Sequence, residues 1–174
     1  ELRPGAAIPV LCSLLFGPPA AWGAAIGNLV GDVLGGTLTP GSVAGFLGNF
    51  LYGLLPWGLW RLMSREEPRL MSFAQLALFA LACLVSSAVC GIIIGGGIGL
   101  LKILPWDVAR ILLYVIPLNN AVMSLVLGGI LLRILYPAVR ALGLTYGQLL
   151  PAGATERDLD DAVPPPPYTP APKE

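Results

Sequence analysis

Six polar residues inside apolar stretches of the chain are the candidates for binding chemistry. They carry a carboxylate, amides or a hydroxyl, and they are Asn28, Asp32, Asn49, Ser86, Asn119 and Asn120. Asn28 and Asp32 are four residues apart, so a helix would place both on one face. In a membrane a carboxylate costs about 2.5–3.5 kcal/mol on insertion scales, and by default it marks a functional position facing the bundle interior. These side chains therefore predict a polar site that hydrogen-bonds a small solute.

Two other interpretations of the same residues remain open. Asp32 at the outer interface would cap a loop or pair with Arg3. The amides and the serine would then form hydrogen bonds between helices, which are typically worth under about 2 kcal/mol per contact in a membrane.

Residues for catalysis or metal binding are scarce in this sequence. It has no histidine, and its three cysteines, Cys12, Cys83 and Cys90, lack the spacing of a zinc site. No Walker motif is present for ATP hydrolysis, and an isolated Asp32 has no partner base. We therefore expect neither an enzyme nor a metal or cofactor site.

The composition predicts an integral membrane protein, multi-pass in the cell membrane. Of 174 residues, 56% are hydrophobic and 11% are charged, whereas a soluble domain carries about 25% charged residues. The net charge is zero, which gives no basis for nucleic-acid binding.

The apolar runs predict an all-α, polytopic helix bundle over residues 1–150. About five spans are expected, at residues 6–16, 20–38, 42–63, 70–101 and 108–135. The fourth is longer than one span needs, so we expect it to tilt or to break near Gly95, Gly96 and Gly97. Residues 136–150 are expected to form a short surface helix or an exit segment. Residues 151–174, rich in proline, are expected to be a disordered cytoplasmic tail.

Arginines near the predicted span ends indicate the orientation. They are Arg61, Arg65, Arg69, Arg133 and Arg140. The positive-inside rule places these residues in the cytoplasm. The six polar candidates then fall between the membrane centre and the outer surface, where a solute from outside would arrive.

Glycines recur every four residues in the second predicted span, at Gly23, Gly27, Gly31 and Gly35. Such a ridge lets a neighbouring helix approach closely, so helix packing is the expected role. Related spacings occur later in the chain, at Gly41, Gly45 and Gly53 and at Gly91, Gly95 and Gly99. The alternative is that these small residues leave room for a ligand.

The run "LRPGAAIPVLCSLLFGPPAAWGAAIGNLVGDVLGG" resembles the substrate-binding S components of energy-coupling factor (ECF) transporters. The similarity is clearest to their vitamin and queuosine-precursor groups, over residues 2–60. It implies six spans, the first of which would precede Glu1, and capture of a vitamin-like small molecule on the outer side. It also implies a transmembrane coupling subunit and ATPase subunits as partners. No ligand residue of the family maps onto a position of this sequence.

The sequence thus predicts a substrate-binding membrane subunit of a vitamin or small-metabolite uptake transporter, in contact with membrane lipid. The alternative is a membrane scaffold or assembly subunit that transports nothing. The glycine-lined helix faces are equally compatible with that role.

Overall fold

The computed structural model describes residues 3–149, which fold into helices with no strand among them. In chain order the elements are the 3-10 turn η1 (Pro4–Ala6), α1 (Ala7–Phe16), α2 (Pro19–Leu34), α3 (Gly41–Met63), α4 (Phe73–Leu100), α5 (Trp106–Met123), the π-helical segment η2 (Ser124–Gly128), α6 (Gly129–Ala141) and α7 (Tyr146–Leu149). The predicted all-α helix bundle is confirmed.

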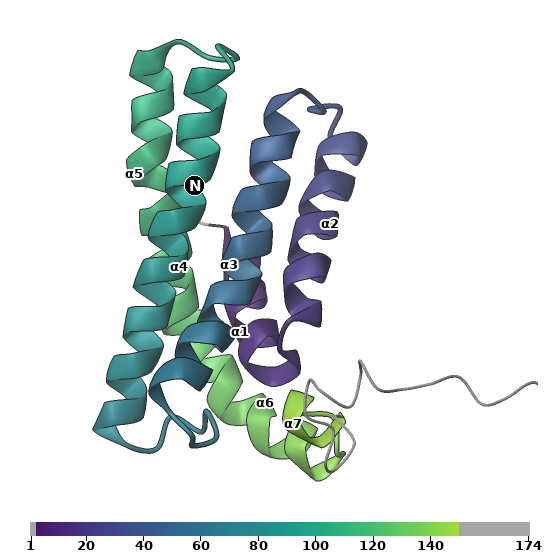
Figure 1. Ribbon diagram of the computed structural model, residues 1–174, viewed down its shortest axis with the longest axis vertical. Helices are drawn as coiled ribbons and strands as arrows, with labels where there is room; N and C mark the ends of the chain where they lie inside the picture. Colours follow the sequence, from purple (N-terminus) through teal and green to yellow (C-terminus); the bar gives the residue numbers. More distant parts are fainter. Residues whose placement is uncertain (1–2, 150–174) are drawn as a thin grey trace, which may run out of the picture.

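Two long antiparallel hairpins, α2–α3 and α4–α5, run side by side along the molecule (Figure 1). We call the end that carries residues 35–40 and 101–105 the open end. The opposite end holds the α3–α4 loop, the end of α6 and α7, and we call it the arginine end. Its arginines are Arg61 near the end of α3, Arg65 and Arg69 in the following loop, and Arg133 and Arg140 of α6.

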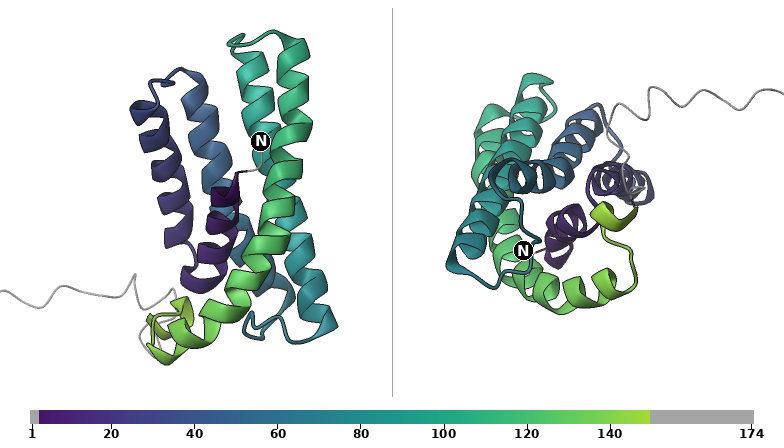
Figure 2. Two further views of the ribbon diagram at one scale, coloured as in Figure 1. Left: turned by 180° about the vertical axis from the view of Figure 1, so that it is seen from behind. Right: turned by 60° about the horizontal axis from the view of Figure 1, so that its bottom comes forward.

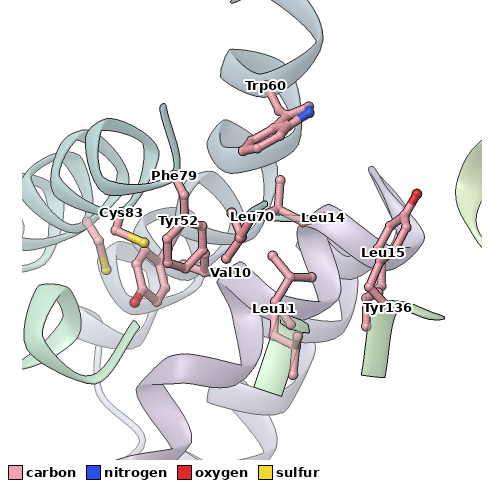
Figure 3. Close-up of a cluster of buried hydrophobic side chains, with 12 residues drawn as sticks. Val10, Leu11, Leu14, Leu15, Tyr52, Trp60, Leu70, Phe79, Cys83 and Tyr136 are labelled. Carbon is pink, nitrogen blue, oxygen red and sulfur yellow. The ribbon is translucent and has the colours of Figure 1, made fainter. Parts of the chain in front are cut away.

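The short helix α1 fills the centre of the bundle only in the half nearer the arginine end. The described chain enters midway along the molecule, and α1 runs from there toward the arginine end (Figure 2). Val10, Leu11, Leu14 and Leu15 of α1 are buried against side chains of α3, α4 and α6 (Figure 3). The turn η1 and α1 together have about 13 residues, or roughly 20 Å of helix. Among residues 3–149, no helix lies at the centre of the half nearer the open end.

The turn between α1 and α2 depends on Gly17. Its φ of 66° lies in the left-handed region, which glycine adopts without the steric cost that a Cβ brings. A Cβ added at Gly17 would also lie 2.6 Å from the ring of Tyr146 in α7. Pro19 then occupies the first turn of α2, where its missing N–H costs nothing.

Glycines make the close contacts between successive helices. They belong to the two glycine series predicted later in the chain, at positions 41, 45 and 53 and at positions 91, 95 and 99. An added Cβ at Gly53 of α3 would lie 2.8 Å from the Cα of Ala21 in α2. Along α4, the glycines at positions 91, 95 and 99 face Pro117, Leu113 and Trp106 of α5 in turn. These backbones approach so closely because there is no side chain between them.

The ridge on α2 does not have the predicted packing role within residues 3–149. Added Cβ atoms at Gly23, Gly27 and Gly31 would meet nothing within 4 Å, and one at Gly35 would meet only Gly31 and Thr37 of its own segment. The physical reason is that α2 lies at the edge of the bundle (Figure 2). It contacts α3 through its alanine face, so the glycine face points outward.

The surface of the bundle is apolar, as in a membrane protein. Leu34, Phe73 and Leu118, on three different helices, expose 83%, 87% and 67% of their surface. Within the described part of the chain, two helical stretches are long and apolar enough to cross a bilayer, Phe73–Leu100 and Trp106–Leu149, and Pro4–Phe16 is a shorter apolar helix.

The structure decides two points that the sequence left open. The helix α4 runs unbroken through its glycine run, because Gly95 packs on Leu113 and Gly97 on Ala44, and these contacts hold the segment between neighbouring helices. Residues 136–149 do not form one surface helix, since only Tyr146–Leu149 form a short helix of their own, α7. Instead α6 continues the preceding helix to Ala141, and the chain turns at Gly143, whose φ is 72°.

Candidate functional site

A cavity of about 1020 Å³ occupies the half of the bundle that α1 leaves empty. Pro4, Gly5, Ala6 and Pro9, at the start of the described chain, line the side nearer α1. The walls come from α2 and α3 on one side and from α4 and α5 on the other. A site of this size, formed between helices, is at the upper end of the roughly 300–1,000 Å³ range of small-molecule pockets.

The α2–α3 wall carries the carboxylate of Asp32 and the amides of Asn28 and Asn49. The Asn28 amide donates to Asp32 Oδ2 across 3.5 Å, and Asn49 donates to the main-chain oxygen of Gly45 across 2.9 Å. An added Cβ at Gly45 would lie 2.8 Å from Nδ2 of Asn28. The glycine therefore makes the room that the Asn28 side chain occupies.

The opposite wall carries Asn119 and Asn120 of α5. Asn119 accepts a hydrogen bond of 2.9 Å from the backbone N–H of Arg3, which ties the start of the described chain to α5. The Asn119 amide also donates to Asn120 across 3.4 Å, and Asn120 donates to Cys90 Sγ across 3.7 Å. These contacts are long, so both amides keep hydrogen-bonding capacity toward the cavity.

Tyr52 of α3 joins the cavity lining to the core and is 1% exposed. Its hydroxyl lies 2.8 Å from the carbonyl oxygen of Ala6 and 3.3 Å from that of Asn120, and it also bonds the hydroxyl of Ser124. The tyrosine thus connects α3, the start of α1 and the helix that carries the asparagine pair.

Branched aliphatic side chains from the α4–α5 side complete the cavity lining. Ile94 and Ile98 belong to α4, Ile103 to the following loop, and Val115 and Ile116 to α5. A flat apolar ring face would fit against such a surface, while the amides and the carboxylate bond its polar edge.

The structure brings five of the six predicted site residues to this one cavity: Asn28, Asp32, Asn49, Asn119 and Asn120. Ser86 lies elsewhere. It is fully buried, and its hydroxyl donates to the Ala82 carbonyl of its own helix across 2.6 Å. Arg3 lines the same cavity as Asp32, but no ion pair within 4.0 Å joins the two among residues 3–149.

Sequence reasoning missed Arg3, Tyr52, Thr39 and Ser42 as lining residues. For Tyr52 a signal was available, because it follows Asn49 by three residues and therefore shares its helix face. No comparable signal marks Arg3, since its position depends on where the short helix α1 sits in the bundle.

A family model described as QueT transporter matches residues 1–137, which include both cavity walls. No curated protein and no solved structure matches the chain.

Proposed function

We propose that the cavity of this chain binds a queuosine precursor for uptake. The premise is that the chain belongs to the QueT transporter family, which is a family of ECF S components. The observation that carries the proposal is the convergence of Asp32 and four asparagine amides on one cavity beside an aliphatic surface. The membrane subunit would bind the solute, and partner subunits would supply the energy.

The polar groups match the edge of a guanine-like base, the ring type of queuosine precursors. Such a base offers a ring N–H next to an exocyclic amine, and one carboxylate can accept from both donors. Asp32 would accept this pair, with Asn28 holding the carboxylate in place. Asn119 and Asn120 would bond the remaining ring atoms from the other wall, while the isoleucines cover a ring face.

The direction of uptake follows from the arginine distribution. Five arginines at one end of the bundle favour that end in the cytoplasm, so the open end would face outward and admit the solute. The helices α1, α2, α3 and α4 would then each be a membrane segment, and the consecutive helical segments α5, η2 and α6 would together form a fifth. A transmembrane coupling subunit and ATPase subunits would act as partners, as the family implies.

Equilibrium dialysis of the purified full chain with a radiolabelled deazaguanine base tests the proposal. Asp32→Asn is expected to lower the affinity about 10- to 100-fold, because hydrogen bonds to a charged group are worth about 1.5–3 kcal/mol. Asp107→Asn is the matched control. Its carboxylate lies at the same end of the molecule and is 93% exposed, 3.7 Å from Arg110, so its affinity should equal that of the parent.

Adenine serves as the competing probe, since it cannot present two adjacent N–H donors to one carboxylate. Strong displacement by adenine, or equal affinities for the Asp32→Asn and Asp107→Asn variants, would contradict the recognition proposed here. If the parent chain retains no base, the alternative function gains support, namely a membrane scaffold that transports no solute.

A further inference from the structure

A second pocket, of about 580 Å³, lies at the arginine end, far from the cavity described above. The guanidinium groups of Arg69, Arg133 and Arg140 line it, together with Tyr136 and with Gln148 of α7. These residues come from the α3–α4 loop, from α6 and from α7. The fold therefore assembles the pocket from segments distant in sequence.

The pocket carries an excess of positive charge. Glu67 accepts from Nε of both Arg69 and Arg140 at 2.8 Å, so one carboxylate faces two guanidinium groups. Among residues 3–149, the one polar contact of the Arg133 guanidinium is to the thioether sulfur of Met71, at 3.9 Å, and Arg133 forms no ion pair there. A thioether is a weak acceptor, so most donors of Arg133 are free to bind an anion.

The surroundings of the pocket match a lipid better than a free ion. Ile130, Ile134 and Pro137 of α6 follow one another at helical spacing, so they share a face. The two isoleucines are 54% and 64% exposed, and Pro137 lines the pocket. An apolar stripe thus leads from the start of α6 into the basic pocket, as acyl chains lead to a headgroup.

We propose that this pocket binds the phosphate of an anionic lipid headgroup, with the acyl chains along the exposed stripe of α6. Arg133 and Arg140 contact the phosphate oxygens, since arginine presents several N–H donors in one plane. Basic pockets between membrane helices are suited to such headgroups. The site does not depend on the identity of the transported solute.

Native mass spectrometry of the purified full chain, titrated with phosphatidylglycerol or phosphatidylcholine, tests the proposal. Phosphatidylglycerol should bind more tightly, and Arg133→Gln should weaken its binding about fivefold, the factor that one basic residue contributes near a charged lipid. Arg110→Gln is the matched control, because Arg110 is also exposed but lies at the open end. It should bind phosphatidylglycerol as the parent does.

Three results would overturn the proposal. The first is equal loss of binding in the Arg133→Gln and Arg110→Gln variants, or none in either. The second is displacement of phosphatidylglycerol by millimolar inorganic phosphate, which would assign the pocket to the free anion. The third is lipid binding seen only after Glu156, Asp158, Asp160 and Asp161 are changed to amides, which would make the chain's own acidic segment the occupant. A melting temperature equal to the parent's shows that Arg133→Gln remains folded.

Discussion

Replacement of Gly91 by alanine tests whether the glycines of α4 hold the α4–α5 hairpin together. The added Cβ would lie 2.2 Å from Cγ and 2.4 Å from Cδ of Pro117. Two carbon atoms touch at about 3.5 Å, so the overlap is roughly 1.3 Å. The proline ring is rigid and cannot rotate away, so α4 and α5 must separate.

We expect Gly91→Ala to destabilise the fold by about 3 kcal/mol, the upper part of the usual 1–3 kcal/mol range for overpacked sites. In a chain of this length that corresponds to a melting temperature lower by about 6–12 °C. Gly96→Ala is the matched control, because it makes the same substitution in the same helix where nothing lies within 4 Å. Its melting temperature should stay at or slightly above that of the parent.

Thermal unfolding of the detergent-purified variants, followed by circular dichroism, provides the measurement. The double variant Gly91→Ala with Pro117→Ala should recover part of the loss, because removal of the ring removes the overlapping atoms. Equal melting temperatures for the Gly91→Ala and Gly96→Ala variants would refute the close contact between α4 and α5. A double variant no more stable than Gly91→Ala alone would show that the proline ring is not the cause.

Two further predictions concern polar groups. Tyr52→Phe should destabilise the fold by about 1–2 kcal/mol, since it removes a buried hydroxyl from its acceptors. In the same thermal assay the control Tyr114→Phe should leave the melting temperature unchanged, because Tyr114 is 76% exposed. Equal effects of the two substitutions would contradict the role of the Tyr52 hydroxyl. Partial burial raises the pKa of Glu67, but Arg69 and Arg140 outweigh it and hold the pKa below its ordinary 4.5. The stabilisation from Glu67 is therefore complete above that value and is lost as the pH falls below it. The melting temperature of the parent should fall between pH 7 and pH 4, and Glu67→Gln should make this fall smaller. The difference should correspond to under about 1 kcal/mol, because solvent screens the ion pairs of Glu67 with Arg69 and Arg140. An equal fall in the parent and the variant would argue against these ion pairs.

The amino-acid sequence by itself determined the class of the protein and most of its helices. Charge is so sparse, and apolar runs are so long, that they predict a membrane helix bundle, in which each helix satisfies its own backbone hydrogen bonds. Polar side chains stand out in such runs, which is why Asp32 and the asparagines could be selected. The glycines at positions 91, 95 and 99 were also interpretable, because four-residue spacing forms one helix face.

Only the tertiary structure decided which of these residues meet. Ser86 and Asn49 look alike in sequence, and each donates to a carbonyl of its own helix, yet Asn49 lines the cavity while Ser86 is buried away from it. The difference is helix rotation, and neighbouring helices set it. The glycines of α2 faced outward for the same reason, since an edge helix contacts the bundle through a single face.

The cavity depends on where the helices lie in three dimensions. Among residues 3–149, α1 (Ala7–Phe16) fills the bundle centre in the half nearer the arginine end, and the two long hairpins enclose the space beyond its first residues (Figure 1). A short apolar run shows in the sequence, but its depth in the bundle does not. Packing against Tyr52 and the other core side chains fixes that depth, and thereby places Arg3 and the asparagine pair around one binding space.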